Sequence, residues 1–297
     1  MIRNGVAIDD TFAEAFDMKA TRVIITACEH KWAQQAAITM TGFATSVIGC
    51  GIEAGIEQAL DGKQTPDGRP GVSVLVFAMS GKDLAKHLER RVGQCVLTAP
   101  TSAIFAGLKG EPVNLGRNLR YFGDGYQISK QVGGRRYWRV PVMDGEFLCE
   151  ETTGRQNAIG GGNLLVLAAG VEGALAACES AVAAMGRAPN VIMPFPGGIV
   201  RSGSKIGSKY SSVPASTNDA YCPTLRGVTT SQLGPDVGAV LEIVINGLSD
   251  ADLRQAMTTG IGTLCELGQR HGIKRISAGN FGGKLGPHHY HLRELAP

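Results

Sequence analysis

The segment Ala239–Leu248, which reads AVLEIVINGL, decides how the rest of the chain is interpreted. Its aliphatic and β-branched residues run up to an Asn-Gly pair, a pattern that predicts a buried strand closed by a turn. Because side chains alternate along a strand, Leu241 and Ile243 share one face while Glu242 lies on the other. The chain therefore places a carboxylate in the middle of an apolar strand.

Two interpretations of Glu242 follow from this strand. In one, its face of the sheet is solvated and the side chain is an ordinary strand carboxylate, as in many half-exposed antiparallel sheets. In the other, the face is covered, and a buried unpaired charge is costly. The carboxyl group is then protonated, paired or placed at the edge of a cleft.

The composition describes a soluble globular protein without a nucleic-acid or membrane signature. The 297 residues are 43% hydrophobic and 19% charged, enough for one large domain or two ordinary ones. A net charge of +3, without a basic run interleaved with aromatics, argues against nucleic acid. We find no signal peptide and no apolar run of membrane-spanning length. Seven scattered cysteines without a CxxC motif indicate a reduced, cytoplasmic protein.

The first half of the chain has the pattern βαββαβ. Strands are predicted at 22–27, 45–50, 72–78 and 95–98, and helices at 30–41 and 80–92. This order is typical of a ferredoxin-like fold with an antiparallel sheet. Thr11 and Glu14 have capping-box spacing, which predicts a short helix before the first strand.

The second half repeats this pattern after a region of predicted β-hairpins at 117–150. Ser249 and Asp252 begin its second helix as Ser80 and Asp83 begin the corresponding helix of the first half. We therefore predict a duplicated α+β protein with ferredoxin-like lobes at 1–146 and 147–297, joined by the hairpin region.

The repeat shows which features belong to the second half alone. Aligning the two halves puts Ser73 opposite Glu242 and Phe77 opposite Asn246, so the two polar residues have no counterpart. About twice as many residues separate the inner strands in the second half. The extra segment, 194–224, is rich in Gly, Ser, Lys and Asn, and long loops inside compact domains are usually functional or disordered. We expect it to be ordered and to cover the strand that carries Glu242.

Within this insertion, Arg201, Lys205 and Lys209 stand among small residues that allow close approach to the backbone, and cations suit an anionic ligand. A solvated basic loop is the alternative. Nearby, Asn218, Asp219 and Tyr221 could orient a heterocycle through hydrogen bonds, or form an Asx-turn with a packed tyrosine.

Two features near the end of the sequence are weaker indications. Asn280 and Lys284 flank a Gly pair that could form a second turn for a phosphate or carboxylate, although a lone Gly pair is weak support. His288, His289 and His291 lack a cysteine or carboxylate cluster at ligand spacing, so we predict no metal site.

Long segments distributed over nearly the whole chain carry a family resemblance. They are TFAEAF (11–16), HKWA (30–33), EAGI (53–56), TPDGRPGV (65–72), GQCVLTAPT (93–101), FGDGYQ (122–127), PFPGGIV (194–200), SKIGSK (204–209), PASTNDAYCPT (214–224), EIVINGL (242–248) and ISAGNFGGKLG (276–286). With these segments the chain resembles the formylmethanofuran:tetrahydromethanopterin formyltransferase family.

The resemblance implies two ferredoxin-like lobes and a cytoplasmic homo-oligomer, a tetramer or dimer. It also implies that no cofactor or metal is tightly bound, with tetrahydromethanopterin and methanofuran-type coenzymes as substrates. The slightly basic charge favours the version found in methylotrophic bacteria. In that version the chain is one subunit of a formyltransferase/hydrolase complex, beside amidohydrolase-like partners.

The resemblance also implies roles for individual residues. A nitrogen of one carrier attacks the formyl carbon, and Glu242, kept protonated by its apolar strand, stabilises the oxyanion that forms. Lys205, Lys209 and Lys284 would hold anionic groups of the carriers, while Phe195 and Tyr221 pack against a ring. The remaining expected substrate-binding residues are Arg201, Asn218, Asp219, Asn246 and Asn280.

Three alternatives stay open at this stage. The chain could be a structural subunit that organises hydrolase partners, which transfer by the purified protein would exclude. It could use a folate-type pterin, which a comparison of the two pterins as substrates would decide. It could also be a ligand-binding or sensing module, which turnover with defined stoichiometry would exclude.

Overall fold

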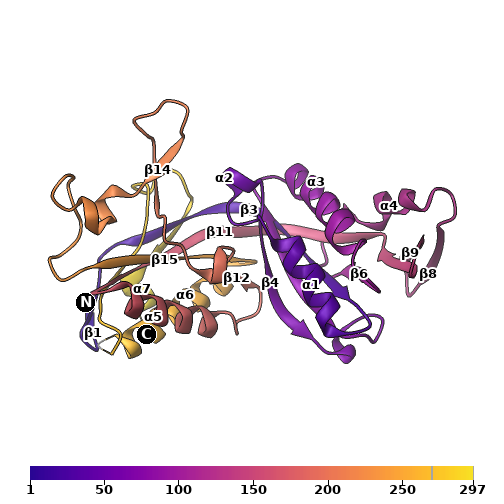
Figure 1. Ribbon diagram of the computed structural model, residues 1–297, viewed down its shortest axis with the longest axis horizontal. Coiled ribbons are helices and arrows are strands. Elements are labelled where there is room, and N and C mark those ends of the chain that lie inside the picture. The colour runs from indigo at the N-terminus through magenta and orange to yellow at the C-terminus, as the bar shows by residue number, and fades with distance from the viewer. Residues whose placement is uncertain (269, 297) are drawn as a thin grey trace. The chain divides into compact units, whose positions relative to one another are not determined.

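The computed structural model describes residues 1–268 and 270–296, which form two compact units. Unit 1 comprises Met1–Phe16 and the chain from Ile159 onward, and unit 2 comprises Asp17–Ala158. Two long strands, β3 (Phe12–Thr26) and β11 (Thr152–Ala168), contribute residues to both units. Figure 1 shows the course of the chain.

Unit 1 is built on a sheet in the order β1-β2-β16-β11-β15-β12. Its remaining strands form a hairpin, β13–β14, and a pair between β17 and β3. The strands are β1 (Ile2–Arg3), β2 (Val6–Ile8), β12 (Val191–Ile192), β13 (Ser204–Ile206), β14 (Ala215–Thr217), β15 (Ala239–Gly247), β16 (Ile273–Ser277) and β17 (His288–His291). The helices are α5 (Val171–Met185), α6 (Asp250–Leu267) and α7 (Leu292–Leu295), with short 3-10 turns at Pro196–Gly198, Asp219–Tyr221 and Pro223–Leu225.

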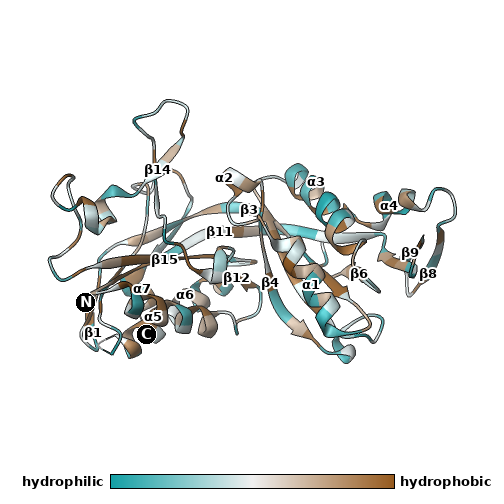
Figure 2. Cartoon of the chain, viewed as in Figure 1, coloured by the Kyte–Doolittle hydropathy of each residue, from teal (hydrophilic) through white to brown (hydrophobic). Residues whose placement is uncertain are grey.

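Helices α5 and α6 cover one face of this sheet. The predicted alternation in β15 is confirmed, because Leu241, Ile243 and Ile245 are buried in the core with both helices. Ser249 caps α6 by accepting the N–H of Asp252 at 3.2 Å, as its sequence position predicted. Figure 2 shows the hydrophobic colouring along β15.

The opposite face of the same sheet is covered by the insertion between β12 and β15. Leu165 and Leu167 of β11 pack there against Tyr221 of the insertion and against Leu233 and Val237, which follow the insertion in the chain. The insertion is thus ordered and lies over the face that carries Glu242, as the sequence led us to expect. Its hairpin β13–β14 extends away from the sheet (Figure 1).

Unit 2 has a sheet in the order β4-β5-β3-β6-β10-β9-β8, with β7 paired to the start of β11. Its further strands are β4 (Glu53–Leu60), β5 (Gly71–Ala78), β6 (Ala103–Ala106), β7 (Glu111–Asn114), β8 (Ile128–Val132), β9 (Arg135–Val142) and β10 (Gly145–Glu150). The helices are α1 (His30–Thr41), α2 (Val47–Cys50), α3 (Gly81–Arg91) and α4 (Gly116–Leu119), with a π-helical segment at Val92–Val96 and 3-10 turns at Gly62–Gln64 and Arg120–Gly123.

The core of unit 2 forms between its sheet and the helices α1 and α3. Ala33 and Met40 of α1 and Leu84 and Leu88 of α3 are buried against the strands. Ser80 accepts the N–H of Asp83 at 3.1 Å and so caps α3, as predicted. The β8–β9–β10 meander confirms the predicted hairpins over residues 128–150, whereas residues 117–123 of the predicted hairpin region are helical.

The class α+β is observed, but the sheets are mixed rather than antiparallel throughout. β2 pairs with β16 in parallel, and β6 pairs with β10 in parallel. Each parallel pair joins one strand of a repeated βαββαβ segment to a strand from outside it. The expectation of antiparallel sheets overlooked these added strands.

Three local predictions were wrong. Residues 12–14 begin β3 rather than a helix, residues 47–50 form α2 rather than a strand, and Val92–Val96 is π-helical where a strand was expected at 95–98. The strands predicted at 45–50 and 95–98 lie a few residues later, at β4 and β6. Short apolar runs do not distinguish a helical turn from a strand.

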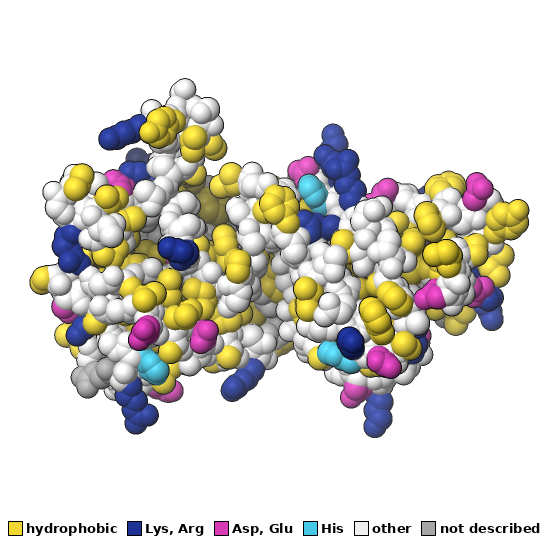
Figure 3. All heavy atoms as spheres, viewed as in Figure 1, with side chains coloured by type: hydrophobic (Ala, Val, Ile, Leu, Met, Phe, Trp, Pro, Cys, Tyr) yellow, Lys and Arg dark blue, Asp and Glu magenta, His cyan; other side chains and the backbone are white. Residues whose placement is uncertain are grey.

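The face of the surface shown in Figure 3 has no large patch of one charge, because Lys and Arg side chains are scattered among acidic and apolar ones. In the part of the chain that the structure describes, no helix has both the length and the apolar character of a membrane span.

Candidate active site

Glu242 lies between two neighbouring segments of unit 1. On one side it pairs with Leu165 of β11, and on the other with Val200 of the insertion. The Val200 N–H donates to the Glu242 carbonyl at 2.7 Å, and the Glu242 N–H donates to the Val200 carbonyl at 2.9 Å. The insertion therefore returns to the sheet at the position of the carboxylate.

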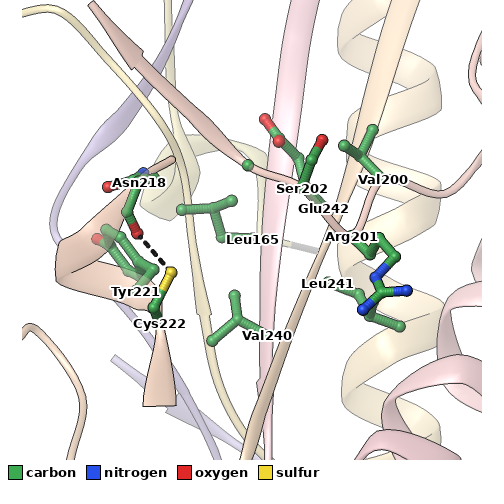
Figure 4. A pocket seen from close by; sticks show the side chains of 11 residues that line it. Leu165, Val200, Arg201, Ser202, Asn218, Tyr221, Cys222, Val240, Leu241 and Glu242 are labelled. Atoms are coloured by element: carbon green, nitrogen blue, oxygen red, sulfur yellow. Dashed lines mark hydrogen bonds between the residues drawn. The ribbon is translucent and has the colours of Figure 1, made fainter. Parts of the chain in front are cut away.

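A cavity of about 40 Å³ opens over Glu242. Figure 4 shows its lining: Leu165, Val200, Arg201, Ser202, Asn218, Tyr221, Cys222, Val240, Leu241 and Glu242, together with Gly203. A water molecule needs about 10–15 Å³ of such space, so the cavity admits a group of only a few atoms. It is suited to a reacting group rather than to a whole ring system.

The carboxyl group of Glu242 titrates near neutrality. Burial against the apolar strand raises its pKa from 4.5 to about 7. In a large fraction of the molecules, Glu242 is consequently protonated at neutral pH. A protonated carboxylic acid can donate a hydrogen bond or a proton. The second of the two sequence interpretations, a covered carboxyl group, is the one the structure supports.

The wall opposite Glu242 is formed by the turn at Asp219–Tyr221 and the residues beside it. The Tyr221 N–H donates to the Asn218 carbonyl at 2.9 Å, and the Cys222 thiol lies 3.4 Å from the same oxygen (Figure 4). These bonds fix the backbone and leave the Asn218 and Tyr221 side chains along the cavity. Of the predicted site residues, Glu242, Asn218, Tyr221 and Arg201 are brought together here.

The three predicted cations of the insertion, Arg201, Lys205 and Lys209, have different surroundings. Arg201 lines the cavity, but its guanidinium points away from the Glu242 carboxyl (Figure 4). The ammonium of Lys205 bonds the carboxylate of Asp219 across the base of the β13–β14 hairpin, and this contact lowers the pKa of Asp219. Lys209 is exposed near the tip of that hairpin. The roles of these three cations in binding substrate stay predictions.

Asn246 and Phe195 lie outside the cavity lining. Asn246 is fully buried, and its Oδ1 accepts the Gly161 N–H at 2.9 Å, next to an irregularity in the register between β11 and β15. Its observed contact is thus with the fold. Phe195 is half-buried just before the turn at Pro196–Gly198.

The turn that follows β16 already holds an anion from the chain itself. The carboxylate of Glu14 accepts the N–H groups of Phe281, Gly283, Leu285 and Gly286 at 2.6–2.9 Å. Burial alone would raise the pKa of Glu14, but these four N–H donors lower it to about 2.

Asn280 supports this turn rather than facing the cavity. Its amide nitrogen donates to the Thr11 hydroxyl and the Phe12 carbonyl, both at 3.1 Å. Lys284 is exposed beside it. In residues 1–268 and 270–296, no group of three or more His, Cys, Asp or Glu side chains is placed to hold a metal ion.

Several residues that line the cavity were not predicted from the sequence as site residues: Leu165, Val200, Ser202, Cys222 and Val240. A signal existed for Val240, which lies two residues from Glu242 on the same strand face. No local signal pointed to Leu165 or Val200, because their positions depend on strand register.

Fold and site together define an α+β protein of two compact units in which an insertion closes a small cavity over a carboxyl group that titrates near neutrality. Two family models cover nearly the whole chain: "Formylmethanofuran-tetrahydromethanopterin formyltransferase" over residues 1–142, and "FTR, proximal lobe" over residues 145–295. The chain belongs to the formylmethanofuran–tetrahydromethanopterin formyltransferase family.

Relatives agree over their full lengths. The chain is 68% identical over 296 residues to the formylmethanofuran–tetrahydromethanopterin formyltransferase of Methylococcus capsulatus, covering 99% of each protein. It is 52% identical to a subunit of the formyltransferase/hydrolase complex of Methylorubrum extorquens, with 98% of this chain and 96% of that protein covered.

Two solved structures are also similar. One is the formyltransferase/hydrolase complex from Methylorubrum extorquens with methylofuran, at a TM-score of 0.98 and 51% identity, covering 100% of this chain and 99% of the other. The other is the formyltransferase from Methanosarcina barkeri, at 0.94 and 46%, covering 99% and 100%.

Proposed function

We infer that this chain is a formyltransferase that moves a formyl group between N5 of tetrahydromethanopterin and the amine of a methanofuran-type carrier. The transfer activity and both carriers follow from membership of the family, at 68% identity over 99% of the chain. The observation that carries the mechanism is the carboxyl group of Glu242, with a pKa of about 7, in a cavity with room for a few atoms.

The proposed reaction is a direct attack of nitrogen on the formyl carbon. The new C–N bond forms as the carbonyl π electrons move onto oxygen, and the tetrahedral intermediate then expels the other nitrogen, which takes up a proton as the attacking nitrogen loses one. No covalent bond to the protein is needed, so positioning of the two carriers supplies much of the rate. Protonated Glu242 donates a hydrogen bond to the developing oxyanion.

Carrier binding is proposed for residues beyond the cavity, which is too small for a pterin ring. Exposed Lys209 and Lys284 would meet anionic groups in the tails of the carriers, and Arg201 would do so from the cavity edge. Asn218 and Tyr221 would orient the reacting end of a carrier, and Phe195 would pack against a ring. We propose no tightly bound cofactor, with both coenzymes acting as substrates.

We also propose that each unit has a ferredoxin-like core, which goes beyond the observed α+β class. In unit 1 the sheet order is β12-β15-β11-β16, and in the chain α5 connects β11 to β12 and α6 connects β15 to β16. In unit 2 the sheet order is β4-β5-β3-β6, and in the chain α1 lies between β3 and β4 and α3 lies between β5 and β6. This shared order supports a duplication, for which we propose the sequence lobes 1–146 and 147–297.

The cellular setting is proposed from one relative. The Methylorubrum extorquens protein is named as a subunit of a formyltransferase/hydrolase complex. We propose that this chain likewise assembles with amidohydrolase-like subunits in the cytoplasm and forms a dimer or tetramer of its own. The complex would then release as formate the formyl group that this subunit transfers.

The test is formyl transfer by the full-length protein, with 5-formyl-tetrahydromethanopterin as donor and a methanofuran analogue as acceptor. We expect Glu242→Gln to lower kcat with a modest change in KM, because the lost interaction belongs to the transition state. Wild-type kcat should fall as the pH rises through about 7, where Glu242 loses its proton. Glu179→Gln, at an exposed position of α5, is the matched control.

Several results would count against this proposal. An unchanged kcat in Glu242→Gln would remove the oxyanion role, and equal rates with a folate-type pterin would overturn the assignment of the carrier. A folded wild-type protein without transfer activity, both alone and with its hydrolase partners, would point to the structural-subunit alternative.

A further inference from the structure

A hydroxyl group lies beside the Glu242 carboxyl in the same cavity. Ser202 follows Val200 by two residues, and Val200 is paired directly with Glu242 through two backbone hydrogen bonds. Directly opposed residues of an antiparallel pair point to the same face, so Val200 and Glu242 share a face of the sheet. Ser202 lies in the bend that follows this single bridge, and it lines the same cavity as Glu242.

The side-chain positions agree with this register. In Figure 4 the Ser202 hydroxyl and the Glu242 carboxyl extend from neighbouring segments in the same direction, whereas Arg201, between Val200 and Ser202, points away. The pairing with β15 is limited to Val200, and Gly203 adopts a left-handed backbone conformation with φ of 48° directly after Ser202. The return segment thus brings one polar side chain beside the carboxyl group before it leaves the sheet.

A single neutral hydrogen-bond donor stabilises an oxyanion only in part. Oxyanion sites in acyl transfer commonly direct more than one preorganised donor at the position where charge develops. The other polar side chains of the cavity are the amide of Asn218, the phenol of Tyr221 and the thiol of Cys222, all on the opposite wall, and the guanidinium of Arg201, which points away. Ser202 is the donor next to Glu242 in this lining.

We propose that Ser202 is a second catalytic donor, whose hydroxyl binds the same formyl oxygen as Glu242 during transfer. This rests on the proposed function. Ser202 would donate its O–H to the oxyanion and keep its proton, so that no covalent ester forms and the formyl group passes directly between the nitrogens. Glu242 of β15 and Ser202 of the neighbouring bend would then hold the oxygen together.

The experiment compares kcat and KM for formyl transfer in the full-length protein and in the variants Ser202→Ala, Ser202→Thr, Glu242→Gln and Ser211→Ala. Ser202 is exposed at the cavity mouth, so alanine should fold normally, and Ser211 is an exposed serine in the hairpin tip that serves as control. We expect Ser202→Ala to lower kcat by about 10- to 100-fold with little change in KM, since one oxyanion donor is lost. Threonine, which keeps the hydroxyl, should restore kcat to within about threefold of wild type.

The outcomes separate this inference from the function on which it rests. A loss in Glu242→Gln without a loss in Ser202→Ala would overturn the role of Ser202 and leave the proposed function in place. A rise in KM alone, or threonine as impaired as alanine, would show that Ser202 holds a carrier or shapes the cavity and would also overturn it. An unchanged kcat in Glu242→Gln would overturn the oxyanion role of Glu242 and the site that Ser202 is proposed to share with it, while the transfer activity itself would stand. A wild-type protein without transfer activity would overturn the proposed function.

Discussion

Glu242 and Glu14 are strand carboxylates of the same unit whose surroundings push their pKa values in opposite directions. Glu242 lies against apolar neighbours, and burial raises its pKa to about 7. Glu14 is more completely buried, yet four backbone N–H groups hold its pKa at about 2. For Glu14, hydrogen bonds to the charged form outweigh desolvation, whereas desolvation alone shifts the pKa of Glu242. This difference supports the proposal that Glu242 acts in the reaction, while Glu14 stabilises the fold.

Glu242 should lower the stability of the fold at alkaline pH. The pKa of Glu242 is higher in the folded than in the unfolded chain, so folding favours the protonated carboxyl group. Its contribution to the free energy of unfolding is therefore fully present below about pH 4.5 and is lost as the pH rises through about 7. We expect Glu242→Gln to gain about 1–2 kcal/mol in free energy of unfolding, relative to wild type, between about pH 5 and about pH 8. Urea unfolding at both pH values measures this, with Glu179→Gln as control, and parallel curves for wild type and Glu242→Gln would contradict it.

Glu14 should contribute stability that is present at neutral pH and lost in acid. Its folded pKa lies below the unfolded value, so the contribution is complete above about pH 4.5 and disappears as the pH falls towards about 2. Glu14→Gln should cost roughly 3 kcal/mol at pH 7, because buried N–H groups left without an acceptor cost about 1–3 kcal/mol each.

Denaturant midpoints at pH 7 and in acid would measure the effect of Glu14→Gln. Glu266→Gln, at an exposed position of α6, is the matched control. A variant as stable as wild type at pH 7 would show that the loop from Phe281 to Gly286 does not depend on the carboxylate.

The sequence placed the first of these carboxylates correctly on its strand face and the second wrongly in a helix, for one physical reason. The alternation that placed Glu242 on its own strand face is local, and a local pattern suffices to find it. Glu14 was assigned to a capping box with Thr11, but its partners lie 267–272 residues away in the chain. No local spacing reveals a partner at that distance.

At the scale of elements, the pair between Val200 and Glu242 should control the cavity. Proline at position 200 cannot donate the hydrogen bond that the Val200 N–H gives to Glu242. We expect Val200→Pro to lower kcat by about 100-fold, because a displacement of about 1 Å at a reacting centre can cost that much. Amide exchange at Glu242, which donates its N–H to Val200, should become faster.

The control for this change is Val200→Ala, which keeps both backbone hydrogen bonds and loses only side-chain packing. It should keep kcat within about threefold of wild type, since the segment stays in register. Equal losses in the two variants would assign the effect to packing rather than to the strand pair.

The element predictions succeeded where a pattern was long and failed where it was short. The helices α1, α3, α5 and α6 and the strands β5 and β15 agree with their patterns because each has several turns or alternations. The four-residue α2 and the π-helical segment Val92–Val96 resemble strands in composition, and tertiary packing decides between the two forms. The mixed sheets could not be predicted, since parallel pairs such as β2 with β16 join segments far apart in the sequence.

At the scale of the whole molecule, the proposed self-association has a physical basis in exposed apolar surface. In unit 2, an apolar hollow of about 720 Å³ is lined by Leu97, Ala99, Phe122, Val142 and Met143, among others, and Phe122 and Met143 are largely exposed. Clustered exposed apolar side chains of this kind mark contact surfaces more often than free ones. A net charge of +3 offers little electrostatic repulsion between copies.

We therefore expect light scattering on the purified full-length chain to give the mass of a dimer or tetramer. The mass should be the same in low and high salt, because salt screens contacts between charges and not contacts between apolar side chains. Dissociation in high salt would assign the association to charged surfaces instead. The mass of a single chain at all concentrations would contradict self-association and would leave assembly to the hydrolase partners alone.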